Sequence, residues 1–454
     1  TLPNQIAAIL NNPSYETATW GIEIVGYQGG EREELFSLLK NNFRVPASNT
    51  KLLTTSALFS IVDVDKEHFE TPVYYSEENG GKKLCIKGSG DPSLSFHQMQ
   101  ELAKLLSLEG FRDVKDLTLD NTLFYSNYGQ GQPFLQSWQW EDIGAAYGAH
   151  PNSPMVEENA FYVTVSASSI GNPPTLEFSV PSSVIKVKNT AVTVQSNDPR
   201  TLQVYWKMGA PYLTIEGNIP SGEALGYHLA AIDSDDFYIS LFQQALEEEG
   251  IEVEQTLVGE CNTSSKIVGV MTSQAWNVLF NHTLQESDNF YAEAWLRALG
   301  LTFYPTSSDP PAQRGLNAVS AVLSQNLGVS ESCHRQVDGC GVSVQNLVTP
   351  HCIMEILEGV DNLPNGQEYF DFLPLAGESG TLSSRFVGTD AQGKVRAKTG
   401  TITGTNALSG IVDNQNYDTL LFSILVNESN QPASVIRQGI DSIVELLPDL
   451  DPSC

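Results

Sequence analysis

The sequence predicts a mixed α/β protein in which a domain with helices at both ends of the chain is interrupted by a β-rich insertion. Helical apolar spacing marks the start of the chain and most of its second half, whereas residues 160–215 contain short β runs broken by turn sequences such as Gly-Asn-Pro-Pro. The length of 454 residues allows about two to four domains. Helices that return after a β-rich middle therefore indicate one domain holding an insertion.

The individual elements follow from the same patterns. Alternating apolar residues over 17–27 predict a strand. Pro46 and Ser48 lie at the start of a stretch with helical apolar spacing that ends at Phe59, and this arrangement is typical of the beginning of a helix. From residue 394 the patterns predict a strand, a turn and a second strand. Helices are expected over 4–11, 235–250, 273–285, 288–299, 312–326 and 433–446.

Composition narrows the range of functions. The chain has 24 Lys and Arg against 54 Asp and Glu, a formal net charge of −30 at pH 7. This excess of negative charge repels phosphate backbones and anionic lipid, so we expect no nucleic-acid partner. No apolar run approaches the ~18–20 residues of a membrane span. The chain begins at Thr1 without an initiator Met, so we expect that a leader has been removed or that the sequence is truncated.

The six cysteines do not have the spacing of a metal site. None lies in a C-x-x-C pair or at a zinc-like distance from histidine, and we expect neither metal nor cofactor. An even number is compatible with disulfides in an oxidising compartment, and isolated buried thiols are the alternative. Six cysteines allow 15 complete pairings. They are Cys85, Cys261, Cys333, Cys340, Cys352 and Cys454.

Three short motifs occur in order: Ser48-x-x-Lys51, Ser287-Asp288-Asn289 and Lys398-Thr399-Gly400. Chance alone should produce S-x-x-K about twice in a chain this long, so the first motif is weak by itself. In a helix, however, positions i and i+3 share a face, which lets Lys51 reach the Ser48 hydroxyl.

Second copies of two motifs are expected to be structural. Ser183 and Lys186 lie in an alternating β run, where an odd offset sends two side chains to opposite faces. Ser324-Gln325-Asn326 closes a helical stretch just before Leu327-Gly328, which is typical of a helix C-terminus. Lys-Thr-Gly occurs once.

The motif residues match the needs of acyl transfer. Ser48 is the candidate nucleophile, and Lys51 is its candidate base if burial or a neighbouring cation such as Lys398 depresses its pKa. The helix start at Ser48 supplies a favourable dipole and a backbone N–H for an oxyanion. The remaining candidates are Ser287 as proton relay, Asn289 as amide holder, Lys398 as carboxylate anchor, Gly400 as the place where substrate lies on the strand edge, and Thr401 N–H as second oxyanion donor.

The ordered motifs resemble those of active-site serine penicillin-interacting enzymes. Over nearly the whole chain the sequence is similar to the low-molecular-mass class C penicillin-binding proteins, the D-alanyl-D-alanine carboxypeptidase/endopeptidase family. Supporting segments begin at Gly88 (GSGDPSL), Trp140 (WED), Tyr147 (YGA), Asp338 (DGCGVS) and Ala376 (AGESGTL), and the last spans Lys398–Gly404.

The resemblance assigns further roles at matching positions. Ser48, Lys51, Ser287, Asn289 and Lys398 take the catalytic places. Thr399, Gly400, Thr401 and Thr403 are implied to bind substrate. Asp142 matches an acidic residue that contacts the amino group of the substrate's peptide side chain, and Tyr147 matches an aromatic position lining the cleft. A structural loop is the alternative for both.

The family's fold implies an α/β catalytic domain with a five-stranded antiparallel sheet flanked by helices, and two inserted β-rich domains. The catalytic domain would comprise residues 1–60, 88–160 and 265–454. Domain II would comprise 61–87, 161–180 and 236–264, and domain III 181–235. The change near residue 160 to short β runs broken by turn sequences agrees with an insertion. The patterns alone, however, could not assign 88–160 to the catalytic domain.

Two positions depart from the family pattern. The usual segment Asp-Gly-Ser-Gly-Leu-Ser-Arg reads Asp-Gly-Cys-Gly-Val-Ser-Val here. Val344 replaces an arginine associated with the peptide substrate, which makes the preferred stem peptide an open question. Cys340 replaces a serine, and a disulfide with Cys333 or Cys352 would brace this loop.

The resemblance implies an extracytoplasmic serine DD-peptidase that hydrolyses the terminal D-Ala-D-Ala bond, and sometimes crosslinks, of peptidoglycan stem peptides through an acyl-enzyme. It also implies covalent inhibition by β-lactam antibiotics. A β-lactamase is an alternative, although no class A deacylating-Glu motif is visible and the long insertion fits the peptidase better. A non-catalytic peptidoglycan-binding protein is another alternative, but all five catalytic side chains are retained. The oligomeric state is left open.

Overall fold

A computed structural model describes residues 1–78, 80–124, 137–207 and 209–452. The chain divides into two compact units. The described residues of the first unit are 1–67, 137–138 and 274–452, and those of the second unit are 68–124 and 139–273, without 79 and 208. Each unit has its own sheet and its own hydrophobic core.

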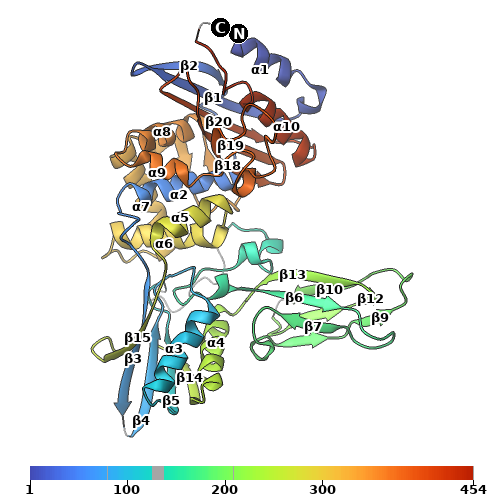
Figure 1. Ribbon diagram of the computed structural model, residues 1–454, viewed down its shortest axis with the longest axis vertical. Coiled ribbons are helices and arrows are strands. Elements are labelled where there is room, and N and C mark those ends of the chain that lie inside the picture. The colour runs from blue at the N-terminus through green and yellow to red at the C-terminus, as the bar shows by residue number, and fades with distance from the viewer. Residues whose placement is uncertain (79, 125–136, 208, 453–454) are drawn as a thin grey trace. The chain divides into compact units, whose positions relative to one another are not determined.

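The first unit is built on a five-stranded sheet in the order β18-β19-β20-β1-β2 (Figure 1). Every neighbouring pair is antiparallel, so the sheet that the family resemblance implied is confirmed. It joins the two ends of the chain, because β1 pairs with β20 from Thr19↔Asn427 to Tyr27↔Thr419. The strands are β1 (Thr19–Gln28), β2 (Glu31–Leu38), β18 (Val395–Ile402), β19 (Thr405–Val412) and β20 (Thr419–Asn427).

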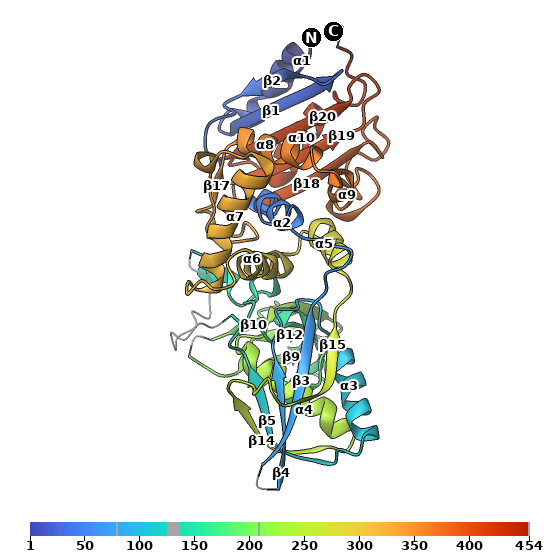
Figure 2. The same cartoon turned by 90° about the vertical axis from the view of Figure 1, so that its left-hand side faces the viewer.

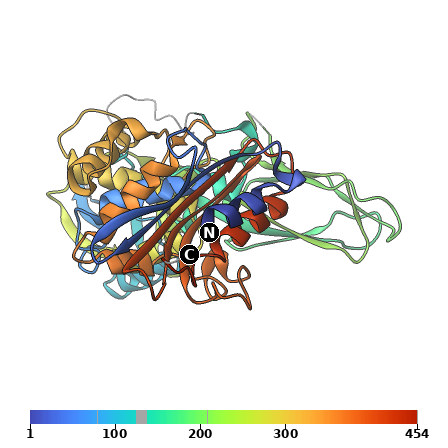
Figure 3. The ribbon, with the colours of Figure 1, turned by 90° about the horizontal axis from the view of Figure 1, so that it is seen from above.

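Helices cover both faces of this sheet, and β1 is buried on both sides. Ile22 and Ile24 pack in one core with Ile6 and Ile440 of α1 and α10, which run side by side in Figure 3. Gly21 faces the other way, where a Cβ would lie 2.8 Å from Pro350 of α8. This alternation is the period of two expected of a strand. The helices are α1 (Leu2–Leu10), α2 (Thr50–Phe59), α5 (Trp276–Gln285), α6 (Asn289–Phe303), α7 (Pro311–Leu327), α8 (Pro350–Asp361), α9 (Gly366–Asp371) and α10 (Ala433–Val444).

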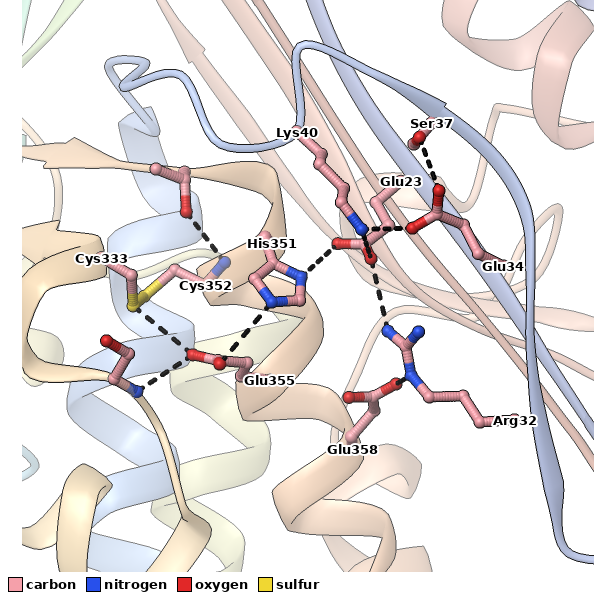
Figure 4. A network of polar contacts seen from close by, with 12 residues as sticks. Glu23, Arg32, Glu34, Ser37, Lys40, Cys333, His351, Cys352, Glu355 and Glu358 are labelled. Atoms are coloured by element: carbon pink, nitrogen blue, oxygen red, sulfur yellow. Dashed lines mark hydrogen bonds and ion pairs between the residues drawn. A yellow bond between two sulfur atoms is a disulfide. The ribbon is translucent and has the colours of Figure 1, made fainter.

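An ionic network around one buried carboxylate connects α8 to β1 and β2 (Figure 4). Glu23 of β1 is completely buried and contacts three cationic side chains. Its carboxylate lies 2.8 Å from His351 Nδ1, 3.2 Å from Lys40 Nζ and 3.3 Å from Arg32 Nη2. Arg32 also pairs with Glu358 at 2.7 Å. Burial by itself would raise the pKa of Glu23, but His351 and Lys40 outweigh it, so the pKa of this carboxyl is lowered.

The second unit contains a mixed five-stranded sheet in the order β14-β5-β4-β3-β15 (Figure 2). Its β5 is parallel to both neighbours, as βαβ connections through α3 and α4 require. The Cys85–Cys261 disulfide also lies in this unit. The elements are β3 (Glu70–Glu78), β4 (Gly81–Lys87), α3 (Phe96–Leu108), β5 (Asp113–Asp120), α4 (Ser234–Glu248), β14 (Glu252–Val258) and β15 (Lys266–Thr272).

Short strands form the rest of the second unit, in the β-rich stretch that the sequence predicted. They make three small sheets in the orders β10-β11-β8, β12-β9 and β13-β6-β7. Their bounds are β6 (Ala160–Ser166), β7 (Thr175–Phe178), β8 (Val187–Asn189), β9 (Val192–Val194), β10 (Gln203–Trp206), β11 (Leu213–Glu216), β12 (Asn218–Pro220) and β13 (Ala224–Ala230).

The structure divides the chain differently from the prediction, which put 88–160 in the catalytic domain. In this segment β5 forms its hydrogen bonds with β4 and β14, and Met99 and Leu102 of α3 pack in the second core. Only Ser137 and Trp138 of its described residues belong to the first unit. The other predicted boundaries move too: 61–67 join the first unit and 265–273 the second. The division of the insertion into domains II and III stays a prediction.

Within the described residues, no helix has both the length and the apolar character needed to cross a membrane.

Candidate active site

Ser48 lies in a tight turn that starts a helix of the first unit. A 3-10 turn over Ala47–Asn49 runs directly into α2 at Thr50. Ala47 has a φ of 48°, in the left-handed region that non-glycine residues rarely adopt. Two contacts hold it there: its carbonyl accepts from Thr50 Oγ1 at 2.8 Å, and Gly341 passes so close that a Cβ would lie 1.9 Å from the same oxygen. The sequence prediction of a helix start at this point is confirmed.

Lys51 points back at the nucleophile from the first turn of α2. Its Nζ lies 3.0 Å from Ser48 Oγ, 2.7 Å from Asn289 Oδ1 and 2.8 Å from the Cys340 carbonyl oxygen. The side chain is completely buried. Burial lowers the pKa of Lys51, and the negative charges of Asp288, Asp338 and Glu293 act in the opposite direction. The structure therefore gives the lysine the environment that a base requires.

Ser287 and Lys398 form a second pair. Ser287 has a φ of 59° between α5 and α6, and its Oγ accepts from Lys398 Nζ at 2.7 Å. Lys398 is completely buried and also donates to the Thr399 carbonyl at 3.0 Å. Burial and then the charge of Lys51 lower the pKa of Lys398 well below its usual range. Asp288 caps α6 by accepting from Tyr291 N at 3.0 Å, which places Asn289 at the first position of the helix beside Lys51.

The Lys-Thr-Gly strand β18 lies at the edge of the sheet and beside the nucleophile turn. A Cβ at Gly400 would lie 2.8 Å from Pro46 O and 3.1 Å from Ser48 N. The glycine therefore lets the strand approach the nucleophile turn, which is a different reason from the substrate contact that the sequence suggested. Asn49 fixes the same approach by donating from Nδ2 to the Lys398 carbonyl at 3.0 Å.

The threonines of this strand have different surroundings. Thr399 Oγ1 lies 2.8 Å from Thr381 Oγ1. Thr401 and Thr403 are exposed, and Thr403 lies in the turn between β18 and β19. Their predicted contacts with substrate stay predictions.

Asp142 and Tyr147 lie in the second unit and contact each other. The Tyr147 hydroxyl donates to Asp142 Oδ1 at 2.8 Å, and the other carboxylate oxygen accepts from Gln139 N at 2.9 Å. Burial, followed by this hydrogen bond, raises the pKa of Tyr147 to about 12. Tyr147 is 52% exposed, whereas Asp142 is 9% exposed. The carboxylate that was expected to meet substrate already has partners inside its own turn, and its role in recognition stays a prediction.

The structure also identifies functional candidates that the sequence reasoning missed. The sequence drew attention to the side chain of Cys340, but it is the backbone carbonyl of this residue that contacts Lys51. Glu293, one helical turn after Asn289, is completely buried and accepts from Gly339 N at 2.5 Å and Cys340 N at 3.1 Å. Its signal in the sequence was a carboxylate within the apolar helix of the Ser-Asp-Asn motif.

The cysteine pairing excludes the disulfide that was considered between Cys340 and either Cys333 or Cys352. Cys333 and Cys352 are bonded to each other, and Cys340 is free and buried. The disulfide thus closes the base of the segment that carries Cys340, without using Cys340 itself. Burial raises the pKa of the Cys340 thiol well above its usual range, so the thiol is neutral at neutral pH.

The second copies of the motifs are structural, as predicted. Ser183 bonds Gln244 and Lys186 pairs with Asp236, rather than with each other. Residues 182–184 form a 3-10 turn, however, and not the β run that the alternation suggested. Ser324-Gln325-Asn326 lies at the end of α7, which Gly328 closes with a φ of 72°.

A serine in contact with a buried lysine, next to an edge strand that carries a second lysine, is typical of the active-site serine penicillin-interacting enzymes. Comparison with known proteins makes this more specific. Residues 2–447 match the D-Ala-D-Ala carboxypeptidase 3 (S13) family.

Two relatives match over most of their length. Penicillin-sensitive carboxypeptidase A of Dictyostelium discoideum is 33% identical over 97% of this chain and 90% of its own. A D-alanyl-D-alanine carboxypeptidase of an Actinomadura species is 30% identical over 96% of this chain and 83% of its own. In fold, the crystal structure of penicillin binding protein 4 (dacB) from Haemophilus influenzae matches with a TM-score of 0.82 at 22% identity, covering 97% of this chain and 98% of that one.

The chain belongs to the D-Ala-D-Ala carboxypeptidase 3 (S13) family. It is a serine-type D-Ala-D-Ala carboxypeptidase with the penicillin-binding-protein fold.

Proposed function

We propose that Ser48 is the residue acylated by peptidoglycan stem peptides ending in D-Ala-D-Ala, with Lys51 as its base. The observation that carries this is the 3.0 Å contact between Lys51 Nζ and Ser48 Oγ, made by a lysine whose pKa burial lowers. A neutral Lys51 takes the Ser48 proton as Oγ attacks the carbonyl of the penultimate D-Ala. The C–N bond breaks, the terminal D-Ala leaves with a proton, and water then hydrolyses the ester.

The neighbouring residues take the remaining roles. The oxyanion accepts hydrogen bonds from the backbone N–H groups of Ser48 and Thr401, which is supported by the approach of β18 to the nucleophile turn at Gly400. Ser287 relays the proton to the leaving amine, and Asn289 holds both Lys51 and the substrate amide. Lys398, which has no carboxylate partner among the described residues, binds the terminal carboxylate, whose charge stabilises the ammonium form.

The same acylation applies to β-lactam antibiotics: the C–N bond of the strained ring amide breaks, and the opened acyl group stays on the serine as a stable ester. A structure of the Haemophilus influenzae protein is a complex with a β-lactam. We place the enzyme outside the cytoplasm, which the two disulfides among the described residues support. Cleavage of crosslinks is part of the proposal, and the residue at 344 bears on it because Val344 is 45% exposed where the family has an arginine.

A fluorescent penicillin tests the proposal. Wild-type protein should carry a stable covalent label on a denaturing gel, and should release D-Ala from a synthetic peptide ending in D-Ala-D-Ala but not from one ending in L-Ala-L-Ala. Ser48→Ala should lose both. Ser183→Ala, in the second S-x-x-K sequence, is the matched control and should keep both. Rapid turnover of the penicillin would favour a β-lactamase, and absence of both label and product would indicate a non-catalytic binding protein.

A further inference from the structure

Lys51 must be oriented as well as buried if it is to act as a base. A neutral lysine amine has two N–H donors and one lone pair. Two of the three neighbours of Nζ are carbonyl-type oxygens, Asn289 Oδ1 and Cys340 O, which accept the two donors. The lone pair is then directed at the third neighbour, the hydroxyl of Ser48. The direction of the Cys340 carbonyl therefore decides where the lone pair points.

The loop that carries this carbonyl is fixed by two buried carboxylates. Glu293 accepts from the backbone N–H groups of Gly339 and Cys340. Asp338 accepts from Gly341 N at 2.8 Å and Ser343 N at 2.7 Å. Thr54 of α2 donates to the Gly339 carbonyl at 2.8 Å. The peptide between Gly339 and Cys340 is thus held on both sides.

Glu293 is the member of this set that connects the loop to the catalytic helix α6. It lies one turn after Asn289, so one face of the helix presents Asn289 to Lys51 directly and Glu293 to the loop. Its second oxygen pairs with Arg297 Nη1 at 3.0 Å, and Arg297 is 4% exposed. The ion pair locks the Glu293 carboxylate and leaves its other oxygen for the two N–H groups.

We propose that Glu293 is a positioning residue for Lys51: by clamping the N–H groups of Gly339 and Cys340, it aims the Cys340 carbonyl at the lysine amine and supplies a nearby negative charge. The proposal rests on the proposed role of Lys51 as base. It also explains why Cys340 can replace the serine of the family pattern, since the loop acts on Lys51 through its backbone.

Geometry and charge predict different effects in the pH profile of acylation. Charged or titratable groups acting on Lys51 come from α6 (Asp288, Glu293 and its partner Arg297), from the loop (Asp338, Cys340) and from β18 (Lys398). Acylation rises with pH as Lys51 loses its proton. A negative charge at Glu293 favours the protonated form, so removing that charge lowers the pKa of Lys51 and moves the acid limb to lower pH.

Two variants separate the geometry from the charge. Glu293→Gln keeps an oxygen for the loop but removes the charge, and should shift the acid limb down by about 0.5–1 pH unit. Glu293→Asp keeps the charge but is one methylene too short to reach both N–H groups. It should lower the second-order rate of labelling by fluorescent penicillin about 10-fold or more, with a smaller shift of the limb. Rates are measured between pH 5 and 10 per mole of folded enzyme, with melting temperatures recorded in parallel.

Glu23→Gln is the matched control, because Glu23 is an equally buried carboxylate of the same unit whose partners are Arg32, Lys40 and His351. It should lower the melting temperature and leave the acid limb in place. If both Glu293 variants lower only the melting temperature, with rate and limb unchanged, Glu293 is merely structural and the inference is wrong. If the wild type is not labelled at Ser48, the proposed acyl-enzyme fails, and this inference fails with it.

Discussion

Glu23 and Lys51 are both completely buried ionisable residues of the first unit, but their surroundings treat their charges in opposite ways. Glu23 is surrounded by three cationic side chains, and its pKa is lowered, so it stays ionised (Figure 4). Lys51 is surrounded by a hydroxyl, an amide and a peptide carbonyl, and its pKa is lowered, so its charge is disfavoured. Direct ion pairs favour the charged form of Glu23, whereas for Lys51 burial outweighs the nearby negative charges and favours the neutral amine.

The largest expected effects on labelling and on stability come from substituting Lys51 and Glu23, one at a time. Lys51→Met should reduce labelling by fluorescent penicillin about 10³-fold or more, because the serine loses its base. Its melting temperature should change little, since relief from burying a polar amine offsets the loss of its hydrogen bonds. Glu23→Gln should do the reverse, costing about 3 kcal/mol of stability because Arg32, Lys40 and His351 lose the buried carboxylate that they share, with labelling of the folded protein unchanged.

Labelling kinetics and thermal denaturation on the same preparations measure both effects. Labelling of Lys51→Met at a rate near that of wild type would remove the lysine from the mechanism. A melting temperature of Glu23→Gln equal to that of wild type would show that the network is not a source of stability.

The next largest effect concerns the disulfide between the loop next to Lys51 and the helix of the Glu23 network. The Cys333–Cys352 disulfide joins residues 19 apart, at the base of the loop that carries Cys340, and Cys352 lies in α8 next to His351 of the Glu23 network. Replacing both cysteines by alanine should cost about 3 kcal/mol by the chain-entropy estimate. It should also slow acylation several-fold, because the loop that aims at Lys51 loosens.

The Cys85–Cys261 disulfide of the second unit provides the matched control. Its double alanine variant should melt earlier and be labelled at the wild-type rate. Equal labelling rates in both double variants would mean that the disulfide does not support the geometry around Lys51.

The smallest effect is the pH dependence of stability in the Glu23 network. The hydrogen bond to Glu23 raises the pKa of His351, so this histidine contributes stability that is present below its unfolded-state pKa and lost as pH rises through the folded-state value. Glu23, with a lowered pKa, contributes stability that is lost as pH falls through its folded-state value. The melting temperature of His351→Gln should therefore differ most from wild type near about pH 5.5–6.5, and the difference should shrink by about pH 9.

His97→Gln, whose side chain is 77% exposed in the second unit, should show no such dependence. A difference between wild type and His351→Gln that stays constant from pH 5 to pH 9 would contradict the assigned ion pair.

The sequence predicted the parts of this molecule that local patterns encode. The helices α1, α4, α5, α6, α7 and α10 lie within a few residues of their expected positions, and the i, i+3 argument predicted the contact between Lys51 and Ser48. From residue 394 the patterns predicted two strands, whereas the structure has β18, β19 and β20. The third strand was missed because only a short polar connection separates β20 from β19.

Local patterns do not predict which strands pair when they are far apart in the sequence. Whether β5 joins one sheet or another depends on hydrogen bonds with β4 and β14, and β14 begins more than 130 residues after β5. The Cys340 carbonyl was hidden for a different reason. Every residue has a carbonyl, and only the fold of the loop around Glu293 and Asp338 makes this one part of the site.

The pairing of β1 with β20 has a consequence for synthesis. Roughly 390 residues separate the two strands, and at about 5–20 residues per second a ribosome needs about 20–80 s to make them. During that time the β1–β2 hairpin has no partner for its inner edge, and Ser48 precedes Lys398 by roughly 350 residues. A nascent chain that has not yet reached Lys398 therefore lacks part of the proposed site, and we expect no acylation of Ser48 before β18 and β20 have been made.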